Sequence, residues 1–246
     1  MNRTSDPCQR RYFPLTVFNQ PLDSWQMGSV KNLASIFEEA AHFDQALDSW
    51  QTGAVTDVGS MFQGASKFNQ NINSWQVDSV TQMSSVFGVG NHGVTAAEFN
   101  QPLNSWRTGS VTNFASMFRS CTAFGQNINS WQMGSATNMQ SMFQSAIVFN
   151  QPLDSWQTDS VVDMNNMFEC DKRGAHGYFD ASDSYKPCTR GADNSQTCEW
   201  TGVPLTAFNQ PLDSWQVDSV TSMGNFCKRS KLTAAQLPSS SLGPCE

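Results

Sequence analysis

The sequence predicts an α/β repeat fold: a solenoid of seven strand-turn-helix units with a parallel sheet on one face. Three observations lead to this prediction. Trp recurs mostly at intervals of 25 residues, a Phe and a Gln keep a fixed distance before each Trp, and the apolar residues follow first a strand-like and then a helix-like spacing. A unit of this length cannot bury its apolar side chains alone, so each copy is expected to be stable only against its neighbours.

Each unit reads approximately F-N-Q-P-L-D-S-W-Q, followed by S-V-T and then M-x-x-M-F. The seven units open at Phe18, Phe43, Phe68, Phe99, Phe124, Phe149 and Phe208. The Gln two residues after each Phe and the Ser before each Trp are present in all seven copies. Two longer intervals between the Trp residues of the repeat, before Trp106 and before Trp215, indicate insertions in an otherwise regular array, and Trp200 lies in the second insertion.

Within a unit, the first apolar residues match the frame L-x-x-L-x-L-x-x of leucine-rich repeats, with Trp in one Leu position: Leu22, Trp25, Met27 and Val30. Two inward residues separated by one outward residue predict a short strand around Ser-Trp-Gln. The following apolar residues lie on one face of a helix: Val30, Leu33, Ile36, Phe37 and Ala40.

These patterns predict the boundaries of each part. They are an N-terminal cap over residues 1–17, repeats 1–6 over 18–170 with a six-residue loop insertion within 88–98, a Cys-containing insertion over 171–203, repeat 7 over 204–230, and a C-terminal cap or tail over 231–246.

The repeat resembles the 25-residue repeat of BspA-like leucine-rich-repeat surface proteins, which occur in mycoplasma-type surface lipoproteins and in protists and algae. The shared motif is F-N-Q-P-L-D-S-W…V-T…M-x-x-M-F, and it covers roughly Phe18 to Phe226 apart from the insertions. The resemblance implies an α/β solenoid displayed at a cell surface, with adhesive or recognition roles and no catalytic residues.

Composition excludes several functions. Lys and Arg number 14 against 21 Asp and Glu, giving a net charge of −7, so an electrostatic nucleic-acid-binding face is not expected. No run of 18 apolar residues occurs, and no transmembrane segment is predicted. None of the three His residues has a nucleophile or base at a known spacing, and no phosphate-binding loop occurs. We therefore expect no enzyme activity and no cofactor.

A binding role is predicted from the residue after each Trp, which should point outward from the strand. These residues form the expected partner-binding face for a protein ligand, together with the Ser column before the Trp: Gln26, Gln51, Gln76, Arg107, Gln132, Gln157 and Gln216. Arg107 is the one departure from Gln in this series. A Gln ladder that only keeps the face soluble is the alternative. Ice binding is a further alternative, because a broken Thr row also occurs, but helix capping explains it: Thr56, Thr81, Thr112, Thr137 and Thr221.

The seven cysteines fall into two groups. Cys121 occupies a small-residue position of the repeat, filled by Ala in other copies, and is predicted to be a free buried thiol. The other six are candidate disulfide cysteines in caps and insertion, with pairing undetermined: Cys8, Cys170, Cys188, Cys198, Cys227 and Cys245. Zinc binding is disfavoured because no C-x-x-C pair occurs, and calcium binding by Asp180, Asp183 and Asp193 lacks a recognised spacing.

Taken together, the cysteines favour an extracellular or cell-surface location, although Met1–Pro7 shows no apolar signal segment. The sequence thus predicts a non-catalytic interaction and adhesion solenoid, binding through the outward Gln and Ser residues or through the Cys-containing insertion. The alternative is a structural subunit docked in a larger, possibly organellar, protein assembly.

Overall fold

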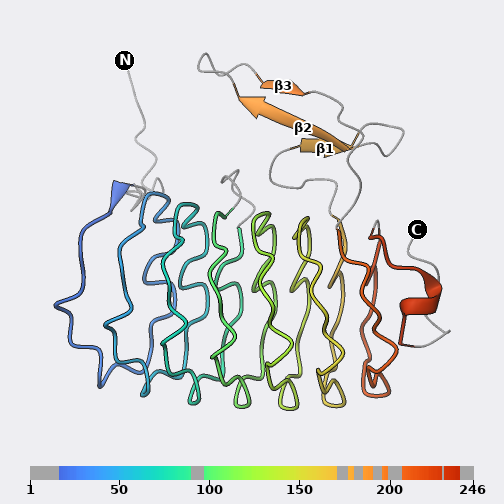
Figure 1. Cartoon of the computed structure of the whole chain (residues 1–246), viewed down its shortest axis with the longest axis horizontal. Helices are drawn as coiled ribbons and strands as arrows, with labels where there is room; N and C mark the ends of the chain where they lie inside the picture. The colour runs from blue at the N-terminus through green and yellow to red at the C-terminus, as the bar shows by residue number, and fades with distance from the viewer. Residues whose placement is uncertain are drawn as a thin grey trace, which may run out of the picture.

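A computed structural model describes residues 17–89, 97–170, 177–179, 185–190, 196–198, 207–228 and 230–238. The chain winds through successive coils that stack side by side along the long axis of the molecule (Figure 1). We call each coil a rung and number the rungs from 1 to 7, each opening at its repeat Phe. Six parallel bridges join the seven rungs in sequence order, from Asn32↔Asp57 to Asp163↔Ser222.

The predicted fold class is wrong about the content of each rung. In the described parts of the rungs there is no α-helix, and the rungs are joined by isolated bridges rather than by a parallel sheet. The bridges also fall outside the predicted strand: they lie at Asn32 and its equivalents, where the helix was expected to begin. The Thr row beside the bridges therefore caps no helix. Its hydroxyls donate along the stack instead, as Thr137 Oγ1 does to the carbonyl of Thr112 (3.1 Å).

Backbone conformation explains why no helix forms. Ser35 and Glu39 both have φ of 59°, and all six other rungs have Ser or Asn at the position of Ser35 with φ between 53° and 57°. A left-handed residue cannot continue a right-handed helix. Alternate backbone N–H groups donate to the next rung instead, for example Ser35 N to Gly59 O (2.9 Å) and Phe37 N to Met61 O (3.0 Å).

The apolar spacing that predicted a helix has a different origin. The backbone N–H groups of the intervening residues bond within their own rung. Each donates to the carbonyl three residues back and so closes a turn, as Ala40 N does to Phe37 O (3.0 Å). A succession of such turns brings residues about three apart to the same side of the chain. Leu33, Phe37 and Ala40 are accordingly buried, as a helix would also have required.

Aromatic columns fill the core of the stack. Four pairs of Trp rings in successive rungs lie parallel with centroids 6.0–6.2 Å apart: Trp25–Trp50, Trp50–Trp75, Trp106–Trp131 and Trp156–Trp215. Each opening Phe also stacks on a Phe of the preceding rung, such as Phe43 on Phe18 at 5.8 Å. The buried indole N–H is satisfied across rungs, since Trp131 Nε1 donates to Leu103 O (2.9 Å).

A second ladder, made of amides, runs along the turn before the Trp. Asn69 Oδ1 accepts from the backbone N–H of Asn100 (2.9 Å) and from Nε2 of Gln101 (3.2 Å) in the next rung. Asn19 and Asn150 make the equivalent pair of bonds to rungs 2 and 7. The Gln two residues after each opening Phe thus links neighbouring turns. These residues are half-buried or exposed rather than buried.

Regular strands occur within the predicted Cys-containing insertion. There β1 (Gly177–Phe179), β2 (Tyr185–Arg190) and β3 (Gln196–Cys198) form an antiparallel three-stranded sheet in the order β1-β2-β3. After rung 7, a 3-10 helix, η2 (Ala234–Gln236), follows Leu232 and precedes Leu237, both of which are buried against the core. The predicted N-terminal cap and the loop insertion lie largely outside the described residues.

Candidate binding face

The residues predicted to point outward do so in every rung. We call them the Gln row: Gln26, Gln51, Gln76, Arg107, Gln132, Gln157 and Gln216, all of which are exposed. The flanking residues point inward, as shown by Trp50 (4% exposed) and Thr52 (3% exposed) on either side of Gln51. The Ser column before the Trp is also exposed. Its hydroxyls bond along the stack, as Ser130 Oγ does to Asn104 O (3.2 Å).

Three members of the Gln row lie over a glycine of the preceding rung: Gln51, Gln76 and Gln132. A Cβ added to Gly53 would lie 2.6 Å from Oε1 of Gln76, so the Gln side chain lies directly over the glycine. In rung 3, Asp78 occupies the position equivalent to Gly53. The member of the Gln row in the next rung, rung 4, is Arg107. Their side chains form an ion pair of 3.9 Å. Arg107 therefore has a local ion-pair partner, but an Asp at this position does not by itself require Arg, since Asp159 of rung 6 is followed in the row by Gln216.

A buried Thr holds the backbone of every second row position. Thr52 Oγ1 donates to Gln76 O (3.1 Å) and accepts from Gln76 N (2.9 Å). Thr108 and Thr158 likewise donate to the carbonyls of Gln132 and Gln216 in the next rung. In odd-numbered rungs the same inward position holds Met or Val: Met27, Val77, Met133 and Val217. Alternate rungs thus differ in how they fix the face.

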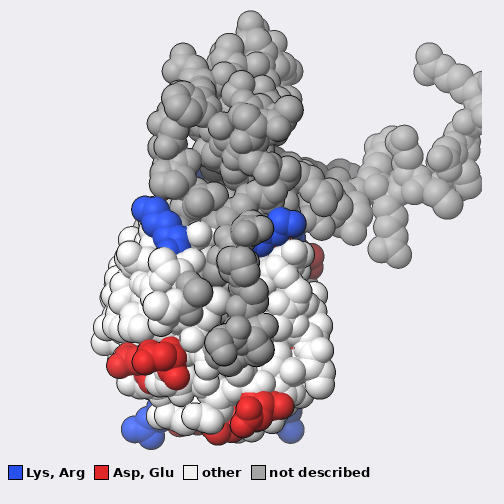
Figure 2. Space-filling view, turned by 90° about the vertical axis from the view of Figure 1, so that its right-hand side faces the viewer, with Lys and Arg blue, Asp and Glu red and all other residues white. Residues whose placement is uncertain are grey.

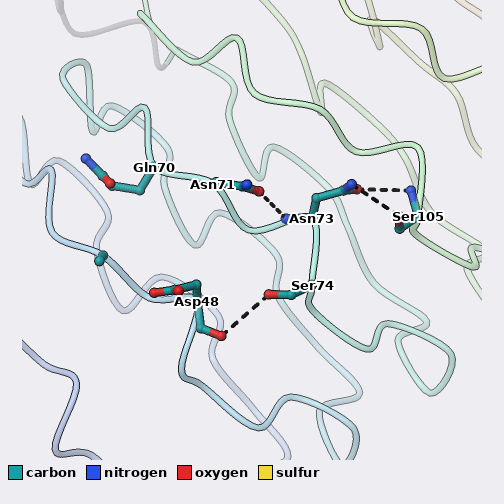
Figure 3. A pocket seen from close by; sticks show the side chains of 7 residues that line it. Asp48, Gln70, Asn71, Asn73, Ser74 and Ser105 are labelled. Atoms are coloured by element: carbon teal, nitrogen blue, oxygen red, sulfur yellow. Dashed lines mark hydrogen bonds between the residues drawn. The ribbon is translucent and has the colours of Figure 1, made fainter.

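Two grooves open beside the Gln row, and we call them the Asn grooves. The first, shown in Figure 3, has a volume of about 540 Å³ and is lined mainly by Asp48, Gln70, Asn71, Asn73, Ser74 and Ser105. The second has a volume of about 590 Å³ and is lined mainly by Asn104, Asn127, Asn129, Ser130, Ser155 and Gln157, with Gln132 at its edge. No Lys or Arg lines either groove.

The two grooves contain the same hydrogen-bonded arrangement. In the first, Asn71 Oδ1 accepts from Asn73 N (2.9 Å), and Asn73 Nδ2 donates to Asn104 Oδ1 (3.0 Å) and Ser105 Oγ (3.1 Å), as the dashed lines to Asn73 in Figure 3 show in part. In the second, Asn127 Oδ1 accepts from Asn129 N (2.9 Å), and Asn129 Nδ2 donates to Asp154 Oδ1 (2.8 Å) and Ser155 Oγ (3.2 Å).

These Asn residues were not predicted from the sequence, although a signal was present. Rungs 3 and 5 read N-I-N where four of the other rungs have Pro followed by Leu and Asp or Asn. Only the spatial arrangement shows that the first Asn of each N-I-N triplet leaves a side-chain amide facing a groove.

Charge is sparse on the part of the surface seen in Figure 2, which views the molecule from its C-terminal side. Acidic and basic side chains occur there in small separate clusters, and uncharged residues cover most of the described surface between them. Recognition at such a surface must depend on hydrogen bonds and shape more than on long-range attraction.

The cysteines are distributed between the stack and the insertion. Cys121 is a free buried thiol whose Sγ donates to Phe87 O, and burial raises its pKa well above the ordinary value. Cys170, one of the candidate disulfide cysteines, is buried in rung 6, with its side chain 4% exposed. Its backbone N–H donates to Lys228 O of rung 7.

The other cysteines lie elsewhere. Cys227 is buried in rung 7, and Cys188 and Cys198 occupy directly paired positions on β2 and β3. Cys8, Cys245 and the three Asp residues considered for calcium lie outside the described residues. Within the described part of the chain, no group of three or more His, Cys, Asp or Glu is placed to hold a metal ion. The same residues include no helix long and apolar enough to cross a membrane.

Stacked coils with one continuous row of exposed side chains, uncharged except for Arg107, define a repeat protein with an extended face. Comparison with known families agrees with this class. The chain matches the family described as "Mycoplasma protein of unknown function, DUF285" three times, over residues 10–93, 91–177 and 203–239, and it belongs to that family. No curated protein and no solved structure matches the chain.

Proposed function

We propose that this protein is a non-catalytic recognition and adhesion protein that engages its partner through the Gln row and the Ser column beside it. The observation that supports the proposal is the unbroken exposure of the Gln row over all seven rungs, while the residues flanking it fix its backbone from inside. A face fixed in this way is ordered before binding, so less conformational entropy is lost when a partner binds.

The proposal extends to location. The resemblance to BspA-like surface proteins implies display at a cell surface or outside the cell, and an uncharged amide and hydroxyl face suits contact with another hydrated surface. Membership of the family leaves both points open, because the family is described as one of unknown function.

Adhesion of protein-coated beads to intact cells tests the proposal. The informative variant carries Gln26→Ala, Gln51→Ala and Gln76→Ala, which truncates three neighbouring members of the row that line neither groove. The matched control carries Thr56→Ala, Thr81→Ala and Thr137→Ala, which truncates three exposed side chains on another row. We expect the Gln variant to lose most bead adhesion and the Thr variant to keep it. Equal adhesion by both variants would exclude the Gln row as the binding face.

A further inference from the structure

The two Asn grooves offer more than a polar surface, because each presents an unused donor. Among the described residues, Oδ1 of Asn71 and Oδ1 of Asn127 accept local backbone N–H groups, whereas neither Nδ2 donates to a protein atom. Both side chains are exposed in the groove wall. The neighbouring Asn and Ser side chains are locked to each other across rungs, so each groove is a preformed set of amides and hydroxyls.

We propose that the Asn grooves bind a linear neutral polysaccharide, each groove taking one segment of the same chain. This inference rests on the proposed function and specifies its ligand. A sugar hydroxyl both donates and accepts, and therefore suits a wall of Asn, Gln and Ser side chains.

The composition of the grooves disfavours other ligand classes. Protein partners usually anchor through aromatic residues and Arg in desolvated pockets, and the groove linings offer no apolar pocket of that kind. Trp131 lines the second groove but is 1% exposed. An anionic ligand would find no Lys or Arg, and an apolar small molecule would leave the amides without partners.

The spacing of the grooves favours a polymer over a single sugar. They belong to rungs 3 and 5, so equivalent atoms are two rungs apart, or about 9.6 Å at the ~4.8 Å separation of paired strands. One chain lying along the stack can contact both grooves at once. Each contact alone is weak because it is made by exposed polar groups, and linking the two raises the local concentration at the second groove.

Titration of the ¹⁵N-labelled full chain tests the proposal, with the side-chain amide signals of Asn71 and Asn127 as reporters. The probes are three neutral hexasaccharides: cellohexaose, mannohexaose and laminarihexaose. Hexagalacturonate is the charged control. For any hexasaccharide that binds, the corresponding disaccharide is titrated as well, to compare the affinities. We expect at least one neutral hexasaccharide to shift both Asn signals and to bind at least tenfold more tightly than its disaccharide. The charged hexasaccharide should leave the signals unchanged.

The matched variant is Asn71→Pro with Asn127→Pro, because Pro stands at this position in four of the other rungs. We expect at least tenfold weaker binding of the hexasaccharide. A second variant, Asn71→Ala with Asn127→Ala, introduces the residue that rung 2 has at this position, Ala46. It replaces the Pro variant in the binding measurement if the Pro variant fails to fold. The control variant Gln140→Ala changes an exposed amide outside the grooves and should bind normally.

The proposal is overturned if none of the three neutral hexasaccharides shifts the two Asn signals. It is also overturned if hexagalacturonate binds equally well, or if the folded Pro or Ala variant keeps full affinity. These results can be told apart from failure of the proposed function. If bead adhesion depends on the Gln row but not on the Asn grooves, the Gln row stands as the binding face and the proposal that the grooves bind a polysaccharide is rejected.

Discussion

Arg107 is the one charged member of the Gln row. Its side chain pairs with Asp78 of the preceding rung, which stands where rungs 1, 2, 4 and 5 have glycine. Both side chains are largely exposed, at 76% and 58%. Exposed ion pairs of this kind contribute between nothing and about 1 kcal/mol.

We predict that Arg107→Gln changes the free energy of unfolding by less than about 0.5 kcal/mol, because an exposed ion pair is largely screened. Urea denaturation of both proteins at two salt concentrations measures the change. The double variant Asp78→Gly with Arg107→Gln, which restores the pattern of other rungs, is the control. A loss above about 1 kcal/mol for the single variant would mean that Arg107 has a structural role beyond this ion pair.

Cys121 makes stability depend on pH. Burial raises the pKa of its thiol in the folded protein above the ordinary 9.0, so in alkaline solution the folded state keeps a proton that the unfolded state releases. The contribution is fully present below pH 9 and is lost as pH rises above it, by up to about 1.4 kcal/mol per pH unit.

Cys121→Ala removes this titration and places the residue of rungs 1 and 2 at that position. We expect unfolding free energies between pH 8 and 10.5 to fall more steeply for the natural protein than for the variant. Parallel curves for the two proteins would contradict the burial of a neutral thiol.

Within each rung, the left-handed Ser or Asn decides between helix and coil. The columns of apolar, Gln and Ser residues were predictable, because burial and ladder bonding repeat at the same sequence interval. The local backbone conformation was not predictable. Ser35 and its equivalents are residue types that also occur in helices, and the turns between residues three apart give the apolar side chains the spacing of a helix. The Asn grooves were missed for a related reason: they depend on contacts between rungs.

We predict that Ser60→Val destabilises the protein by about 1–2 kcal/mol, because Ser60 has φ of 55° and a β-branched residue is strained there. Ser60→Gly is the matched control, since glycine adopts this conformation freely, and should change stability by less than about 1 kcal/mol. Chemical denaturation compares them. Equal losses for Val and Gly would show that backbone conformation is not what constrains this site.

The insertion gives a prediction about the predicted disulfides. Cys188 on β2 and Cys198 on β3 are direct partners in the antiparallel register. Paired positions of this kind fall within the Cα separations that a disulfide spans. We predict that these two cysteines are joined. Mass spectrometry of proteolytic fragments under non-reducing conditions should recover a linked pair containing both. Recovery of either cysteine linked to another residue would contradict the assignment.

At the scale of the whole molecule, stability is shared between neighbouring rungs. Trp131 is 1% exposed and stacks on Trp106, and its indole donates to rung 4, whereas Trp25 in rung 1 is 48% exposed. A rung in the middle contributes two interfaces to the array, and the loss of its central side chain weakens both.

We predict that Trp131→Ala lowers the free energy of unfolding by about 3–5 kcal/mol, as expected for a buried aromatic side chain, and leaves Leu103 O without its indole donor. Trp25→Ala is the control, and its greater exposure should make its loss clearly smaller. Urea denaturation followed by circular dichroism measures both. Similar losses at the two positions would mean that rung 1 is as fully packed as rung 5.

The buried Thr residues carry a consequence for how such an array can change in length. Thr52, Thr108 and Thr158 occupy even rungs and Met or Val the odd ones, so each Thr bonds to a neighbour that has none. Rungs 3 and 5, with their N-I-N triplets, are both odd. Loss of one rung by recombination would place two Thr rungs or two apolar rungs together, while loss or gain of two adjacent rungs would keep the alternation. The Thr bonds therefore favour a change in length by pairs of rungs, about fifty residues at a time.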